Sequence, residues 1–285
     1  MSFILAIVSS FSWAVLNLSR KKLVEHFSAP ALLLFLSSTQ SLFFYVLIVI
    51  RGDEIFIPQD NFKAYVISIV SIFLGNITFL KSIKLSEISS VLPILSFTPI
   101  FSIILSSVVL NEWLSLSQII GASIIVIASF FIQSSDKGKI NLSKGALYMI
   151  LSSLCWAFAP IADKMVLKEI SKFAYSFQQQ LVIACVLITY FLISSPKELI
   201  VKWTKQKVYL LLLSVVASMF AIFFQFWSIE GLFVGIFEAF KLAVTLFLTL
   251  IFAKIFLQEN INKKKIISVI IMIIGVFLIS IKNFG

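Results

Sequence analysis

Long apolar runs separated by short polar connections dominate the sequence. Runs with few or no charged residues lie at 2–19, 29–50, 64–80, 88–110, 116–133, 145–162, 173–195, 208–229, 232–253 and 266–281. A helix needs roughly 20 apolar residues to cross the hydrocarbon core of a bilayer, with about 17 as a practical minimum. None of the runs alternates apolar and polar residues, which excludes the strands of a membrane barrel. The pattern predicts an all-α integral membrane protein with ten transmembrane helices and no separate soluble domain.

The composition indicates that lipid, not water, covers most of the surface. Hydrophobic residues make up 60% of the 285 residues and charged residues 13%, and the mean hydropathy is +1.08. A soluble domain of this size is usually about half apolar and about a quarter charged. The run at 2–19 has no basic segment before it and no small-residue cleavage site. We therefore interpret it as a retained span and not as a signal peptide.

The two halves of the chain resemble each other. Trp13 and Trp156 are 143 residues apart, and further identities keep this spacing, pairing Ser9, Ser10, Ala14 and Lys21 with Ser152, Ser153, Ala157 and Lys164. Later in each half, Glu112 and Glu259 are 147 residues apart. Any two hydrophobic helices share some residues, but landmarks at nearly one spacing favour a true repeat. We predict two five-helix units, 1–137 and 138–285.

An odd number of spans in each unit has a geometric consequence. The second unit has to begin on the opposite side of the membrane from the first, so the two repeats have inverted topology. Inverted repeats related by a pseudo-two-fold axis in the membrane plane are a recurrent plan of secondary transporters, with the substrate site near the midplane. The repeat therefore predicts a central site formed by both halves.

The stretch PILSFTPIFSIILSSVVLNEWLSLSQIIGASIIVIAS, at 93–129, resembles the most recognisable block of the EamA branch of the drug/metabolite transporter superfamily. In that family a proline-containing fourth helix ends in a Glu, and a glycine-containing fifth helix follows. The Trp-Ala pair in the first and sixth spans is a second similarity. The resemblance covers essentially the whole chain and implies transport of metabolites or amino acids, without indicating a cargo. In one departure, the second copy lacks both prolines and has Glu238 and Lys241 where the first has Val91 and Ile94.

Glu238 and Lys241 are the only charges inside any of the long apolar runs. Three residues apart on a helix, they share a face and can reach each other. A charge at the centre of a span costs about 2.5–3.5 kcal/mol on insertion scales, so such residues usually face the bundle interior and mark a pathway. Either Glu238 binds a substrate amine or a coupling proton, or Lys241 binds a carboxylate or phosphate. The alternative is a static ion pair that fixes helix packing.

Uncharged polar and aromatic residues inside the runs are further candidates for substrate binding. Asn76 and Gln225 either contact cargo or, as is commoner, hydrogen-bond one helix to another. Trp13 and Trp156 either pack in the core or form the aromatic wall of a cavity. Three consecutive glutamines at 178–180 cover most of a helical circumference, so at least one is expected to face the interior.

Two prolines are expected to kink the fourth span. Pro93 and Pro99 flank ILSFT, and each removes a backbone hydrogen bond. The carbonyl groups freed near Ser96 and Thr98 either contact cargo, which makes Ser96 a candidate site residue, or are satisfied by these two hydroxyls.

The sequence favours some classes of function over others. There is no phosphate-binding G-x-x-x-x-G-K-[ST] loop, so a transporter would draw on an ion or metabolite gradient. A membrane-embedded enzyme requires a metal site or a nucleophile–base set, whereas this chain has one His, in a connection, and no paired carboxylates within its spans. We predict a secondary transporter, an exporter or exchanger of a small metabolite such as an amino acid, and not an enzyme. The alternatives are a channel and, with better support from the repeat, a flippase for a lipid-linked carrier.

The expected partners are a small-molecule substrate and the lipid bilayer, with no cofactor, no metal and no nucleic acid; a homodimer is left open. Lysines in short loops beside anionic headgroups account for the net charge of +10. The expected location is a bacterial inner (plasma) membrane, with the orientation open. If both termini are cytoplasmic, as the resemblance implies, the inside connections hold six basic residues and the outside ones sixteen. The positive-inside rule favours the opposite placement.

Overall fold

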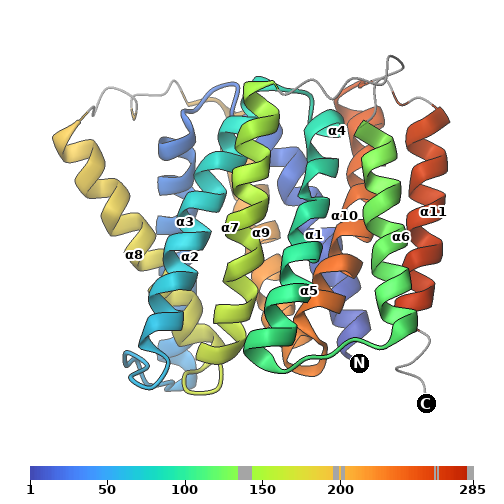
Figure 1. The fold of residues 1–285 in the computed structure, drawn as a ribbon. Helices are drawn as coiled ribbons and strands as arrows, with labels where there is room; N and C mark the ends of the chain where they lie inside the picture. Colours follow the sequence, from blue (N-terminus) through green and yellow to red (C-terminus); the bar gives the residue numbers. More distant parts are fainter. Residues whose placement is uncertain (134–142, 195–198, 200–202, 260, 262, 281–285) are drawn as a thin grey trace.

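The fold was analysed in a computed structural model that describes residues 1–285 apart from 134–142, 195–198, 200–202, 260, 262 and 281–285. All regular elements in the described part of the chain are helical (Figure 1). They are α1 (Ser2–Leu23), α2 (Ala29–Arg51), α3 (Phe62–Leu85), α4 (Ile88–Val91), the 3-10 helix η1 (Leu92–Ser96), α5 (Phe97–Leu110), α6 (Leu116–Gln133), α7 (Lys144–Val166), α8 (Lys172–Ile193), α9 (Lys205–Gly231), α10 (Val234–Phe256) and α11 (Lys263–Ser280).

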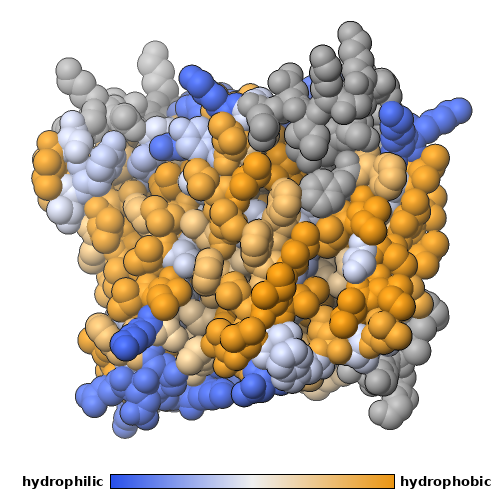
Figure 2. Space-filling model, viewed as in Figure 1, coloured by the Kyte–Doolittle hydropathy of each residue, from blue (hydrophilic) through white to orange (hydrophobic). Residues whose placement is uncertain are grey.

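These helices coincide with the apolar runs of the sequence. Eight helical segments among the described residues are long and apolar enough to cross a membrane, with α4, η1 and α5 forming one of them. The other two predicted spans correspond to α6 and α11, whose apolar stretches, Leu116–Ala128 and Ile266–Val276, are shorter. Figure 2 shows a broad apolar surface along the helices, with hydrophilic residues gathered at the two ends. The chain is a multi-pass integral membrane protein.

Helices α1 and α7 extend past their charge-free runs to buried charged side chains, and this corrects one expectation. Helix α1 continues to Leu23 and includes Arg20, and α7 continues to Val166 and includes Asp163. Both side chains are buried. Glu238 and Lys241 are therefore not the only charges inside the helices, because the runs were ended at the first charged residue and the helices were not.

The helices pack in pairs that mirror the internal repeat. Helix α1 packs mainly against α9, and its counterpart in the second half, α7, packs mainly against α3, the counterpart of α9. Counterparts also pack directly on each other, α2 with α8, α6 with α11 and α5 with α10, and α1 contacts α10 as α7 contacts α5. Each half therefore completes its packing with helices of the other half. We call the end of the bundle at which α1 begins and α11 ends the terminal face (Figure 1).

The Glu landmarks of the repeat cap helices in the opposite half. The Glu112 carboxylate accepts from the backbone N–H of Val234 at 2.7 Å, at the start of α10. The Glu259 carboxylate accepts from the N–H groups of Ile88 and Ser89 at 3.2 and 3.1 Å, at the start of α4. A carboxylate at a helix N-terminus satisfies free N–H groups and interacts favourably with the helix dipole. The same stabilising contact thus occurs once in each half.

The fourth span is interrupted where the sequence places its first proline. The four-residue helix α4 passes into η1, which contains Pro93, and α5 begins at Phe97 with Pro99 in its first turn. Proline fits a first turn because its missing N–H would have no intrahelical partner there. The hydroxyls do not satisfy the freed carbonyls: Thr98 contacts Ser153 on α7, and Ser96 Oγ has no partner among the described residues.

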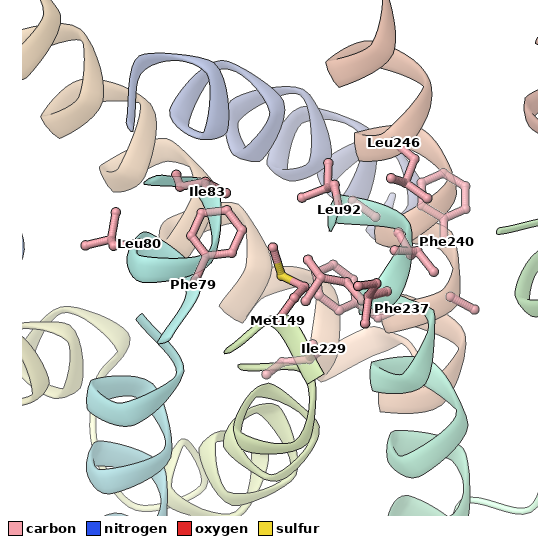
Figure 3. Packing of buried hydrophobic residues seen from close by; sticks show 14 of the residues in the cluster. Phe79, Leu80, Ile83, Leu92, Met149, Ile229, Phe237, Phe240 and Leu246 are labelled. Carbon is pink, nitrogen blue, oxygen red and sulfur yellow. The ribbon is translucent and has the colours of Figure 1, made fainter. Parts of the chain in front are cut away.

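A buried apolar cluster packs helices of both halves together around the centre of the bundle. Figure 3 shows Phe79, Leu80 and Ile83 of α3 on one side, and Phe240 and Leu246 of α10 on the other. All five are buried, whereas side chains such as Leu74, 45% exposed, point outward from the same helices. The bundle therefore has both an apolar outer surface and an apolar core around its polar residues.

Gly75 permits the close contact between α3 and α7, and its replacement tests that contact. A Cβ atom at Gly75 would lie 2.5 Å from the Trp156 indole, whose ring also packs on Phe79 at 5.0 Å between centroids. We expect Gly75→Val to lower the free energy of unfolding by about 1–3 kcal/mol, as other overpacking substitutions do. Thermal unfolding of the purified protein in detergent measures this. The control is Leu74→Phe, which enlarges an outward-facing neighbour; equal losses in both variants would contradict the role of the close contact.

Candidate functional site

A cavity lies at the centre of the bundle, between the two halves. It comprises about 1090 Å³ of empty space, including the part open to solvent. Residues from α1, α2, α3, α5, α7, α8, α9 and α10 line it, together with Leu92 and Leu95 of η1. The polar residues of this lining are Asn17, Arg20, Gln40, Asn76, Thr98, Asp163, Gln179, Gln180, Ser218, Gln225, Glu238, Lys241 and Thr245. A polar cavity inside an apolar bundle is the candidate functional site.

Glu238 and Lys241 form an ion pair on the α10 wall of the cavity. Lys241 Nζ lies 2.5 Å from Glu238 Oε1, and the two side chains are 20% and 2% exposed, respectively. Gln225 of α9 joins them, because its Oε1 accepts from Lys241 Nζ at 3.5 Å and from Trp13 Nε1 at 3.2 Å. The pair is thus tied to α1 and α9 through one amide oxygen. Lys241, the more exposed partner, has the better access to a ligand.

The two tryptophans of the repeat stand side by side in the cavity wall. The ring centroids of Trp13 and Trp156 are 6.2 Å apart, with the planes inclined at 50°. Lys241 Nζ lies 5.8 Å from the Trp13 ring centroid and 5.1 Å from that of Phe237, within cation–π range. Both tryptophans therefore line the cavity, as the aromatic-wall alternative proposed.

The remaining predicted residues are divided between the cavity and the surrounding core. Asn76 lines the cavity; its Nδ2 donates to Ile72 O at 2.8 Å, and its buried Oδ1 has no partner among the described residues. Pro99 also lines the cavity. Ser96 is buried and lies outside the lining residues, and its contact with cargo stays a prediction. Thr98 faces the cavity from this segment instead.

The glutamine run on α8 faces inward, as expected for at least one of its members. Gln179 and Gln180 line the cavity, while Gln178 donates to the backbone oxygen of Phe56 at 2.8 Å. Across the cavity, Gln40 of α2 donates to Ser218 Oγ of α9 at 2.7 Å. Amide side chains of α2 and α8 thus form part of the polar lining, in addition to the groups on α9 and α10.

Asp163 of α7 is a lining residue that the sequence reading missed. It is 1% exposed, and its Oδ1 accepts from Ser68 Oγ at 2.5 Å, Tyr175 OH at 2.7 Å and Gln179 Nε2 at 3.0 Å. These donors belong to α3 and α8, so the carboxylate joins three helices. Its other oxygen, Oδ2, accepts no hydrogen bond from any described residue, and Asp163 borders the cavity.

Arg20 of α1 is the second lining residue that was missed, and it stands at the repeat position of Asp163, 143 residues away. A signal for both was present. Trp13, Asn17 and Arg20 are spaced i, i+4, i+7 and so share one helix face, as do Trp156, Pro160 and Asp163. Arg20 and Asp163 could therefore have been found by extending the helix face that carries each tryptophan beyond the end of its charge-free run.

Polar contacts join the connections of the two halves at the terminal face. The α2–α3 connection contacts the α7–α8 connection through Ser171 Oγ and Asp53 Oδ2, 2.9 Å apart, and through Asn61 Nδ2 and Glu169 Oε1. Lys164 Nζ lies 2.6 Å from Glu112 Oε1 and donates to Leu232 O at 2.8 Å.

The described residues contain no group of three or more His, Cys, Asp or Glu side chains that would hold a metal ion.

Comparison with known proteins supports the interpretation of fold and family. A solved structure described only as a crystal structure of a protein superposes with a TM-score of 0.74, over 97% of this chain and 95% of that one, at 13% identity. An uncharacterized transporter from Archaeoglobus fulgidus is 26% identical over 161 residues, which are 56% of this chain and 57% of that protein. The match thus spans little more than half of the length of this relative.

The family comparison extends over nearly the whole chain. The sequence model of the EamA-like transporter family matches residues 1–134 and 143–281. This match confirms the resemblance found in the sequence and agrees with the expectation that the chain is not an enzyme. The protein belongs to the EamA-like transporter family.

Proposed function

We propose that the protein is a secondary transporter that moves a small metabolite across the membrane by alternating access between two inverted five-helix repeats. The observation that carries this proposal is the central cavity, because charged and amide side chains from both halves line it inside an apolar bundle. Buried polar groups within a membrane are costly and typically mark a substrate or ion pathway. The lining combines a few polar groups with aromatic and aliphatic side chains, as small-molecule sites typically do.

The exchange of helices between the halves supports the inverted repeat. The α1–α9 and α7–α3 contacts are one contact made twice, and the reciprocal caps of Glu112 and Glu259 repeat this relation. Two halves related by a two-fold axis in the membrane plane would make such contacts in pairs. In our proposal the units are 1–137 and 138–285, with ten spans in all, and they rock about the cavity.

The contacts at the terminal face support one step of the cycle. Lys164–Glu112, Ser171–Asp53 and Asn61–Glu169 all join the first unit to the second at that face. In the proposed mechanism these contacts have to break when the cavity opens there. The proposed cargo is a polar metabolite such as an amino acid, moved outward or by exchange across a bacterial plasma membrane and driven by a gradient.

Metabolite profiling tests the proposal. Cells expressing wild type, Glu238→Gln or Glu54→Gln at matched levels are compared, with both cell extracts and spent medium analysed. Glu54 is an exposed residue of the α2–α3 connection and serves as the charge-matched control. We expect one class of small compound to move between cells and medium with wild type and with Glu54→Gln. Glu238→Gln is expected to lose most of this shift, because it removes a charge from the cavity wall.

Two outcomes would contradict parts of the proposal. An equal shift with Glu238→Gln would leave transport standing and reduce the pair on α10 to a packing element. No shift of any water-soluble compound with wild type would contradict a small-metabolite cargo and favour a lipid-linked one.

A further inference from the structure

Arg20 is a buried cation that the protein itself does not neutralise. Its side chain is 3% exposed and borders the cavity. Its Nε and Nη1 atoms have no hydrogen-bond partner, and no carboxylate lies within ion-pair distance of it, among the residues that the structure describes. A guanidinium is always charged and carries five N–H donors in a planar fork. Burying one without partners is costly, so a partner from outside the chain is implied.

The neighbouring Lys21 is a cation with a structural role, and its contacts differ from those of Arg20. Lys21 Nζ donates to the backbone oxygens of Ile83 and Ser86 at 2.6 and 2.8 Å, which ties α1 to the end of α3. Its repeat counterpart Lys164 is likewise held by Leu232 O and Glu112. Arg20 makes no such contact with any residue in the described part of the chain. The helix dipole at the end of α1 favours a cation, but this effect is small and does not satisfy N–H donors.

The acidic residues of the cavity lie too far away to serve Arg20. Helix α1 begins at the terminal face, and α7 ends there (Figure 1). At about 1.5 Å of rise per residue, Arg20 lies roughly 27 Å along α1 from that face, and Asp163 and Glu238 lie roughly 5 Å from it along their helices. Both carboxylates also have partners of their own. Among the described lining residues, the half of the cavity around Arg20 is therefore positively charged and holds no acid.

Unpaired acceptors accompany the unpaired cation. Asn17 precedes Arg20 by three residues on the same face of α1, and its buried Oδ1 has no partner among the described residues. Gln40 Oε1 on α2 is also buried and unpartnered. Both residues border the cavity. A ligand that combines an oxyanion with nearby N–H or O–H donors would satisfy all three side chains.

We infer that Arg20 is the anion-binding residue of the cavity and that the cargo carries a carboxylate or phosphate group, with hydroxyl or amino groups that donate to Asn17 and Gln40. The inference rests on the proposed transport function and adds the chemical class of the cargo to it. Arginine suits this role because its fork pairs with carboxylate and phosphate through two parallel hydrogen bonds. Lys241, already engaged by Glu238, is then not the primary anion site.

Ligand-induced stabilisation of the purified protein tests the inference. Melting temperatures are measured in a nonionic detergent with L-aspartate, L-malate, glycerol 3-phosphate and inorganic phosphate, and with glycerol and L-lysine as comparison compounds. The variants are Arg20→Gln, Arg20→Lys and the control Lys22→Gln, which removes the same charge from the same helix end outside the cavity lining. We expect an anion to stabilise wild type and Lys22→Gln. Its apparent Kd should rise at least about tenfold in Arg20→Gln, corresponding to the loss of one charged hydrogen bond, and less in Arg20→Lys.

A second measurement is independent of the choice of anion. Without ligand, Arg20→Met should melt no lower than wild type, because it replaces an unpaired buried charge with an apolar side chain of similar length. A marked fall in the melting temperature of Arg20→Met would show that Arg20 is structural and would overturn the inference. Anion effects that are equal in wild type and Arg20→Gln, or absent from wild type with both the soluble anions and an anionic lipid, would also overturn it.

Two further experiments distinguish a lipid headgroup from a soluble anion as the ligand, and the anion-site proposal from the transport proposal. If phosphatidylglycerol added to phosphatidylcholine vesicles stabilises the protein through Arg20 and no soluble anion does, the oxyanion site stands and its source is a lipid headgroup. Uptake into proteoliposomes distinguishes the proposals. Transport of a neutral or cationic compound that Arg20→Gln leaves intact would keep the transporter and overturn the anion site. Anion binding through Arg20 without transport would keep the anion site and overturn the transporter.

Discussion

Replacing Lys241 with methionine is expected to lower the free energy of unfolding by about 3–5 kcal/mol, the usual cost of leaving one partner of a buried ion pair alone. The reason is the position of Glu238, which is 2% exposed and has Lys241 as its ion-pair partner at 2.5 Å. Lys241 itself is 20% exposed and also contacts Gln225. Glu238→Gln should therefore cost less than Lys241→Met, because the cation it leaves behind keeps a second partner and access to the cavity.

The double variant Glu238→Gln/Lys241→Met decides what the pair contributes. Replacing both partners of a buried pair is often neutral for stability. We expect the double variant to recover to within about 1 kcal/mol of wild type, which gives a large coupling energy in the double-mutant cycle. Thermal unfolding in detergent measures stability, and uptake into proteoliposomes measures transport on the same samples.

The two readouts separate packing from transport. A double variant that is stable but inactive would show that the charges serve the cargo or its coupling ion. A double variant that is stable and fully active would make the pair a packing element. Additive losses of stability in the two single variants would contradict the ion pair itself, because independent residues show no coupling.

Most of the fold could be predicted from the sequence because the bilayer imposes one length on every span. The run at 88–110 coincides with Ile88–Leu110, and the run at 116–133 with α6. The break at Pro93 follows from the backbone hydrogen bond that proline removes. Boundaries were wrong mainly where a helix continues beyond its first charge, as α1 does through Arg20. There the charged side chain points into a cavity, a feature that hydropathy along the chain does not record.

The candidate site could be predicted where polar residues interrupt an apolar run or where the repeat marks a tryptophan. Gln225, Glu238 and Lys241 were found in this way, and in the structure Lys241 Nζ contacts both the Glu238 carboxylate and the Gln225 amide oxygen. Their contact with Trp13 depends on the packing of α1 against α9, which pairs helices from different halves. The repeat predicts that each contact between the halves occurs twice, but it does not predict which helix of one half packs against which helix of the other. Asp163 was missed because it lies just beyond the charge-free run of α7, and its three donors come from other helices, α3 and α8.

Asp163→Ala is expected to be among the most destabilising single substitutions in the second half of the chain, together with Lys241→Met. It would remove the shared acceptor of Ser68 Oγ, Tyr175 OH and Gln179 Nε2, all of which belong to buried side chains. A buried donor left without an acceptor costs about 1–3 kcal/mol. Gln179 also donates to Ser68 at 3.0 Å, so part of the network survives. We therefore expect a total loss of about 3–5 kcal/mol, less than the sum of three separate losses, on the scale of breaking a buried polar network.

Asp163→Asn isolates the charge from the hydrogen bonds. The asparagine Oδ1 can accept from the same three donors, so we expect a loss of only about 1 kcal/mol, while the charge at the cavity wall disappears. The surface control is Asp53→Ala, which removes a half-buried carboxylate that accepts from Ser171, and surface pairs are worth about 1 kcal/mol or less. If Asn were as destabilising as Ala, the charge and not the acceptor would hold α3, α7 and α8 together. If Ala were as stable as wild type, the network would not contribute to the fold, and the buried carboxylate would be retained for transport alone.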